Sequence, residues 1–127
     1  MKKMLTCLLT ILSLTSAYGQ KSYEDVNVKE FTRLVADSSV VVLDVRTSEE
    51  FVEGHIARAV NVDVKKDDFL TKAKSILPLE KKIAVYCRSG RRSTDACERL
   101  SAEGYMVVNL KGGILVWVDE KVPVLKE

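Results

Sequence analysis

Apolar residues fall along the chain in two patterns, as short, mostly apolar runs and as stretches with helical spacing. Short apolar runs between polar segments are typical of strands that are buried on both faces of a parallel sheet. These runs predict strands at residues 40–45, 82–87 and 105–110, and a brief strand at residues 59–64. Strands are therefore expected at intervals along most of the chain.

Helical periodicity fills the segments between these strands. At residues 26–39, apolar side chains recur at the i, i+3, i+6 and i+7 positions of an amphipathic helix, namely Val28, Phe31, Leu34 and Val35. Further helices are predicted at residues 47–54, 67–77 and 93–103, and, after a glycine turn, within residues 111–120. Their limits are marked by Thr47 or Ser48 as an N-cap and by Gly54, Pro78 and Gly104 as stop signals. Residues 21–25 are expected to form a frayed polar lead-in, and residues 121–127 an extended tail.

This alternation of strands and helices predicts an α/β domain with a mainly parallel sheet and helices on both faces. In sheets of this kind, ligands bind beyond the carboxyl ends of the strands. The strand at residues 82–87 ends at Cys87, so its position makes this thiol a candidate for the functional site.

The start of the chain differs from the rest. Lys2 and Lys3 precede an uncharged apolar run, and Ala17 and Gly19 stand at the −3 and −1 positions for a cleavage before Gln20. This is the three-part pattern of a secretory signal peptide, and the apolar run is shorter than the roughly 20 residues of a spanning helix. We predict a signal peptide at residues 1–19 and a single domain at residues 20–127, exported to a bacterial periplasm without stable membrane insertion. An uncleaved N-terminal anchor is the alternative.

The basic character of the chain depends on this N-terminal segment. The whole chain has 20 basic and 18 acidic side chains, so removal of Lys2 and Lys3 would leave 18 of each. A broad basic surface for nucleic acid is therefore not expected. Positive charge is instead concentrated at Arg88, Arg91 and Arg92.

Two cysteines, Cys87 and Cys97, belong to the predicted mature domain. If Cys87 ends a strand and Cys97 lies in the third turn of the next helix, their Cα atoms would be roughly 12–15 Å apart. A disulfide needs Cα atoms within about 7 Å, so two unpaired thiols are predicted. Cys97 is interpreted as a core residue.

The segment CRSGRRS, residues 87–93, places the Cys87 thiol among cations and before a predicted helix. The thiolate is the reactive form of cysteine, and the pKa of a thiol falls near cations and helix N-termini. If the loop curls at Gly90, its N–H groups converge on the sulfur as an anion nest. Such a ring would stabilise a thiolate or the outer sulfur of a persulfide, and the arginines could hold an oxyanion. The alternative is a buried structural cysteine followed by a solvated turn.

Other polar residues are weaker candidates. Asp44 and Arg46 end the strand at residues 40–45, and we interpret them as an ion pair that braces the loop, with Arg46 facing the site as the alternative. His55 is interpreted as a hydrogen-bonded structural residue. One histidine and two distant cysteines cannot form a zinc site, and neither a metal nor another cofactor is predicted.

Three segments resemble the signatures of the rhodanese-like sulfurtransferase family, in order and over nearly all of the mature chain. Residues 41–62 resemble a signature of Asp-x-Arg, Gly-His-Ile and Ala-x-Asn. Residues 87–93 resemble the active-site loop, and residues 112–124 resemble the C-terminal signature of glycines, tryptophan and a closing proline. Arg58 departs from the family pattern, which often has Gly or Pro there, and this change concerns a turn.

The resemblance implies a three-layer fold with a central, mainly parallel sheet of about five strands. It implies that Cys87 accepts a sulfane sulfur, becomes a persulfide and passes the sulfur to a nucleophile. The loop would bind the persulfide and an anionic donor, thiosulfate or a polysulfide, through Arg88, Ser89, Gly90, Arg91, Arg92 and Ser93. Cyanide, a thiol or a thioredoxin-like protein would accept the sulfur from a monomeric enzyme.

Cysteine phosphatases and arsenate reductases of the same fold are the rival enzymes. Four residues separate Cys87 from Arg92, one fewer than in the phosphatase type of loop. A shorter ring is too tight for a tetrahedral phosphate but fits one sulfur atom, which favours sulfur transfer. A non-enzymatic sulfur carrier or partner-binding module is the other alternative, and the intact Cys87 counts against it.

Overall fold

The computed structural model describes residues 22–127, which form one five-stranded sheet with the order β1-β5-β4-β2-β3. All pairs of neighbouring strands are parallel. The strands are β1 (Glu24–Val26), β2 (Val41–Asp44), β3 (Val60–Asn61), β4 (Ile83–Tyr86) and β5 (Val107–Leu110). The helices are α2 (Val28–Ala36), α3 (Ser48–Glu53), α4 (Phe69–Ile76), α5 (Arg91–Ala102) and α6 (Gly113–Asp119). The predicted α/β class with a central parallel sheet is confirmed.

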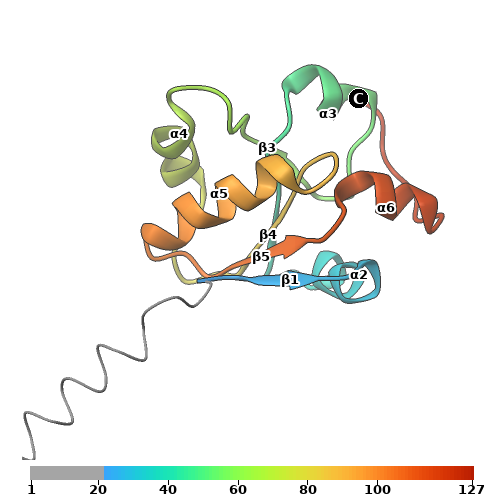
Figure 1. The fold of residues 1–127 in the computed structure, drawn as a ribbon, viewed down its shortest axis with the longest axis horizontal. Coiled ribbons are helices and arrows are strands. Elements are labelled where there is room, and N and C mark those ends of the chain that lie inside the picture. Colours follow the sequence, from blue (N-terminus) through green and yellow to red (C-terminus); the bar gives the residue numbers. More distant parts are fainter. Residues whose placement is uncertain (1–21) are drawn as a thin grey trace, which may run out of the picture.

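Helices cover both faces of the sheet (Figure 1). On one face, α4 and α5 bury Phe69, Cys97 and Leu100 against the strands. On the other face, α2 and α6 bury Phe31 and Trp117. These two clusters divide the core, because successive side chains of a strand point to opposite faces.

The central strand β4 lies between β5 and β2, and all four of its residues are buried. Burial on both faces explains why its sequence is a continuous apolar run. Since β4 ends at Tyr86, the next residue, Cys87, emerges at the carboxyl edge of the sheet. The fold thus places Cys87 at the edge where α/β proteins bind their ligands.

Two sequence predictions at the ends of elements are wrong. The segment expected to be a frayed lead-in buries Tyr23 and runs into strand β1, which begins at Glu24 and pairs with β5. This strand is too short and too polar for a pattern to reveal it, and its stability comes from pairing with β5. Helix α5 begins at Arg91 rather than at Ser93, because Gly90 adopts the left-handed conformation that precedes the helix.

Helix α3 and the C-terminal tail lie side by side, near the C-terminus marked in Figure 1. Thr47 caps α3, and it forms a reciprocal capping box with Glu50. The tail pairs with the residue that follows the helix stop: His55 and Leu125 exchange two backbone hydrogen bonds of 2.8 Å. The tail thereby holds the segment that carries Glu50.

The segment before β3 is held by Arg58, which adopts a left-handed backbone conformation with a φ of 67°. Its guanidinium donates to the carbonyls of Val35, Asp37 and Val40, at and beyond the end of α2. The bond to Val35 satisfies a carbonyl of the last turn of α2, which a helix C-terminus leaves unpaired, and the other two bonds hold the segment between α2 and β2. A glycine would adopt this left-handed turn at lower cost than arginine. Arg58 offsets that cost with the hydrogen bonds of its guanidinium.

The predicted signal peptide lies outside the described residues, and so does the predicted boundary at residue 19. Both stay predictions. Within residues 22–127, no helix is long and apolar enough to cross a membrane.

Candidate active site

Cys87 stands at the carboxyl end of β4 and is only 1% exposed. Its Sγ accepts a hydrogen bond of 3.0 Å from the Gly90 N–H and lies 3.3 Å from Ser93 Oγ. The loop from Cys87 to Ser93 therefore folds back over its own sulfur. Negative charge on that sulfur would face an N–H donor and the first turn of α5.

The curl of the loop depends on Gly90, whose φ is 109°. This backbone conformation is open to glycine and costly for other residues. The Gly90 N–H points to the sulfur, whereas its carbonyl accepts bonds from the N–H of Thr94 and the hydroxyls of Ser93 and Thr94. Gly90 thus donates its N–H to the Cys87 sulfur, and its carbonyl accepts hydrogen bonds from the first turn of α5.

A second glycine, Gly113, lets helix α6 approach the other side of the loop. A Cβ atom added to Gly113 would lie 2.3 Å from the Arg88 carbonyl oxygen and 2.7 Å from that of Cys87. The next N–H groups of α6 donate to these carbonyls: Ile114 to Cys87 at 2.9 Å and Leu115 to Arg88 at 3.1 Å. Two carbonyls of the loop are therefore bound by the N-terminal N–H groups of α6.

The three arginines of the loop have different environments. Arg92 forms a bidentate ion pair with Glu50, with Nη1–Oε1 and Nη2–Oε2 distances of 2.7 and 2.9 Å. The Arg92 guanidinium lowers the pKa of the Glu50 carboxyl to about 2. Within residues 22–127, neither Arg88 nor Arg91 forms an ion pair, and both are exposed. Arg88 and Arg91 are therefore the loop cations left available to an anion.

Glu50 is the site residue that sequence reasoning missed. Glu50 stands three residues after Thr47, the spacing of a capping box, which indicates only that a helix starts there. Its second role, the ion pair with Arg92, joins positions 42 residues apart. A pattern in the sequence indicates the cap but not this distant partner.

Asp44 and Arg46 form an ion pair with an Nη2–Oδ2 distance of 2.6 Å. The Tyr86 hydroxyl donates to Asp44 at 2.7 Å, and Arg46 donates to the Gly54 carbonyl at 2.7 Å. Burial, together with the Asp44 carboxylate, raises the pKa of Tyr86, the residue before Cys87. The pair thus contacts the strand end that carries Cys87, while its role in bracing the loop stays a prediction.

The remaining candidates lie away from the sulfur or inside the core. Cys97 and Cys87 are both free thiols, and burial raises the pKa of Cys97 to about 12. The His55 ring stacks on Phe51, and its Nδ1 lies 3.0 Å from the Ile56 carbonyl. Among residues 22–127, no group of acidic, histidine or cysteine side chains could hold a metal ion.

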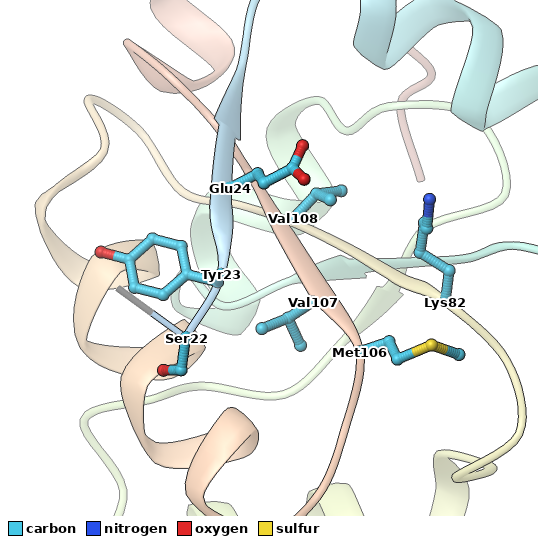
Figure 2. A pocket seen from close by; sticks show the side chains of 7 residues that line it. All are labelled: Ser22, Tyr23, Glu24, Lys82, Met106, Val107 and Val108. Carbon is cyan, nitrogen blue, oxygen red and sulfur yellow. The ribbon is translucent and has the colours of Figure 1, made fainter. Parts of the chain in front are cut away.

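A groove of about 300 Å³ borders the loop, between α3, α6 and the C-terminal tail. It is lined by Arg46, Glu50, Glu53, Gly54, Arg88, Ile114, Leu115, Val118 and Val124. Another hollow, of about 350 Å³, is lined by the side chains shown in Figure 2, among them Glu24, Lys82 and Met106. Because these residues lie at the amino ends of β1, β4 and β5, this hollow is at the edge of the sheet opposite to Cys87.

The fold and the loop together define a class of protein, the parallel α/β domain with a cysteine held in a loop before a helix. A family model described as the rhodanese-like domain matches residues 27–120. The chain therefore belongs to the rhodanese-like domain family, and the resemblance of its three sequence signatures is confirmed.

Relatives and solved structures agree with this family. Thiosulfate sulfurtransferase 18 of Arabidopsis thaliana is 36% identical over 127 residues, covering 91% of this chain and 93% of its own length. A sulfurtransferase of Allochromatium vinosum is 34% identical over 94 residues, covering 73% and 85%. The crystal structure of a rhodanese-related protein from Thermoplasma volcanium is 35% identical, with a TM-score of 0.73, and covers 83% of this chain and 100% of its own.

Proposed function

We propose that the protein is a sulfurtransferase that carries a sulfane sulfur as a persulfide on Cys87. The observation that carries the proposal is the Cys87 loop, in which a buried sulfur accepts the Gly90 N–H at the start of α5. Membership of the rhodanese-like family, with relatives named sulfurtransferase, supports the same class of reaction.

In the first step, the Cys87 thiolate attacks the sulfane sulfur of a donor such as thiosulfate. The S–S bond of thiosulfate breaks, sulfite leaves with the electron pair, and Cys87 holds the new S–S bond. In the second step, a nucleophile such as cyanide attacks the outer sulfur, and Cys87 leaves as a thiolate. Neither step needs an external oxidant or reductant, and covalent transfer of this kind predicts ping-pong kinetics.

The loop favours a sulfur atom over a phosphate group as its occupant. A phosphate would need the last arginine of the loop, but the Arg92 guanidinium is bound at both Nη atoms by Glu50. The carbonyls of Cys87 and Arg88 are bound by α6, and the Gly90 N–H donates to the sulfur. These contacts support sulfur transfer over a phosphatase or arsenate reductase.

The donor, the acceptor and the place of action belong to this proposal. Exposed Arg88 and Arg91 suit an anionic donor, thiosulfate or a polysulfide. The acceptor is cyanide, a thiol or a thioredoxin-like protein, and the enzyme acts as a monomer in a bacterial periplasm.

An intact-mass measurement tests the proposal. The protein lacking residues 1–19 is incubated with thiosulfate, and we expect it to gain the mass of one sulfur atom, which a thiol removes. Cys97→Ser should gain the same mass, and Cys87→Ser should gain none. Thiocyanate production from thiosulfate and cyanide that persists in Cys87→Ser would contradict the assignment.

The same samples separate the alternatives. A phosphatase would hydrolyse an aryl phosphate, and the mass of the protein would not change on incubation with thiosulfate. A passive sulfur carrier would gain the sulfur but would turn over cyanide no faster than the Cys87→Ser variant.

A further inference from the structure

We propose that the groove between α3 and α6 binds the apolar body of an organic thiol, and that this thiol is the sulfur acceptor of the enzyme. The inference rests on the proposed function, since it names the class of acceptor for the persulfide on Cys87. It selects an uncharged, alkyl-bearing thiol over a small inorganic nucleophile.

The groove touches the Cys87 loop at three points. Arg88, the residue after Cys87, lines it directly. Ile114 lines it and donates its N–H to the Cys87 carbonyl, and Glu50 lines it and holds Arg92 of the loop. A molecule in the groove therefore lies against the loop that would carry the persulfide.

One wall of the groove is apolar and exposed. Leu115 and Val118 of α6 are 46% and 52% exposed, although Ile114 and Trp117 of the same helix are buried in the core. Val124 of the C-terminal tail extends this wall. Cyanide or sulfite would not contact such a surface, whereas an alkyl chain would bury it and bind more tightly.

Two of the four charged side chains that line the groove are paired with other residues. The Arg46 guanidinium is paired with Asp44, and the Glu50 carboxylate is paired with Arg92. Glu53 and Arg88 form no ion pair within residues 22–127, and because their charges are opposite, the groove favours neither an anionic nor a cationic tail. Small-molecule sites are mostly apolar clefts of about 300–1,000 Å³, and a groove of this size and charge fits a neutral thiol of a few carbons.

The transfer itself balances without another reactant. The thiol R–SH attacks the outer sulfur of Cys87–S–S⁻, a new S–S bond forms, and the bond to Cys87 Sγ breaks. The products are R–S–SH and the Cys87 thiolate, with the thiol proton retained by the organic hydropersulfide.

A series of neutral thiols of increasing length tests the inference. Protein loaded with persulfide from thiosulfate is mixed with 2-mercaptoethanol, 4-mercaptobutanol or 6-mercaptohexanol. Loss of the added sulfur is followed by intact mass, and it yields a second-order rate constant for each thiol. Full burial of one methylene is worth about fourfold in binding, so we expect about twofold per methylene in this open groove.

Two leucine variants provide the matched comparison. Leu115→Ser should flatten the rise of the rate constant with chain length, because it removes the apolar wall while its backbone N–H still binds Arg88. Leu79→Ser removes a leucine of similar exposure, 56%, away from the groove, and it should keep the wild-type rise.

The outcomes separate this inference from the proposed function. Equal rise with chain length in wild type and Leu115→Ser, or no rise in wild type, would overturn the groove as the acceptor site while sulfur transfer stands. Failure of the protein to take up sulfur from thiosulfate or a polysulfide would overturn the proposed function itself. Circular dichroism and thermal unfolding of both variants show whether each is folded under the assay conditions.

Discussion

The Arg92 guanidinium and the Glu50 carboxylate form two parallel hydrogen bonds, of 2.7 and 2.9 Å. This ion pair joins the first turn of α5, which follows the Cys87 loop, to the capping box of α3. Paired, two-point bonds between arginine and carboxylate are strong and directional. The pair therefore sets the position of α3 relative to the loop.

Replacement of Glu50 by Gln should lower the free energy of unfolding near neutral pH. It should also make that free energy change less as the pH falls. Folding lowers the pKa of Glu50 from 4.5 to about 2, so its stabilisation is present above pH 4.5 and is lost as the pH falls toward 2. Because the pair is partly exposed, we expect a loss of about 1–2 kcal/mol for Glu50→Gln at neutral pH. Urea unfolding at several pH values measures this loss.

Glu49→Gln is the control for this experiment, since Glu49 is also acidic in the first turn of α3 and forms no ion pair among residues 22–127. Glu49→Gln should lose the same interaction with the helix dipole as Glu50→Gln, but it breaks no ion pair within residues 22–127. Equal losses of stability in both variants would assign the effect to the dipole and not to Arg92.

Replacement of Arg88 or Arg91 by Gln should raise the KM for thiosulfate, because these exposed cations of the loop form no ion pair within residues 22–127. A hydrogen bond to a charged group is worth about 1.5–3 kcal/mol, so the rise should be about tenfold or more. Steady-state kinetics at low and high salt measure it, with Lys65→Gln as the control. A rise of the same size in Lys65→Gln would show that the loop is not the anion site.

Cys97 should stay unmodified when the folded protein is treated with iodoacetamide at moderately alkaline pH. Its side chain is fully buried, and burial raises its pKa to about 12, so little thiolate is present. Intact mass of Cys87→Ser lacking residues 1–19, in which Cys97 is the one cysteine left, tests this directly after labelling, and unfolding in urea supplies the positive control. Full labelling of folded Cys87→Ser would contradict the burial of Cys97.

A methyl group at Gly113 should disrupt the packing of α6 on the loop. In Gly113→Ala the Cβ would meet the Arg88 carbonyl at 2.3 Å, and the φ of 68° would be strained as well. We expect a loss of at least about 2 kcal/mol in stability, together with a lower rate of sulfur transfer.

Gly54→Ala is the matched comparison for Gly113→Ala. Its Cβ would lie 3.4 Å from Val124 Cγ2, and its φ of 168° is extended backbone that alanine adopts. Thermal unfolding should show a shift within the range of a surface substitution, about 0.5 kcal/mol. A large loss in both variants would mean that the close approach at Gly113 is not the cause.

Much of the fold could be predicted, because its cues are local. The apolar run at β4, the capping residues of α3 and the glycine after α5 mark their elements within a few positions. Strand β1 could not be predicted in this way, since its three residues depend on pairing with β5. The sequence places Arg58 in a turn, but its bonds to the carbonyls of Val35, Asp37 and Val40 need the folded chain.

The sequence by itself determined the alternation of strands and helices and the position of Cys87 at a strand end, because periodicity and turn residues act over short distances. Only the tertiary structure decided which arginine of the loop forms an ion pair and which two form none within residues 22–127. It also decided that α6 binds the carbonyls of Cys87 and Arg88. These contacts join residues far apart in the chain, and packing selects them from many partners that the sequence allows.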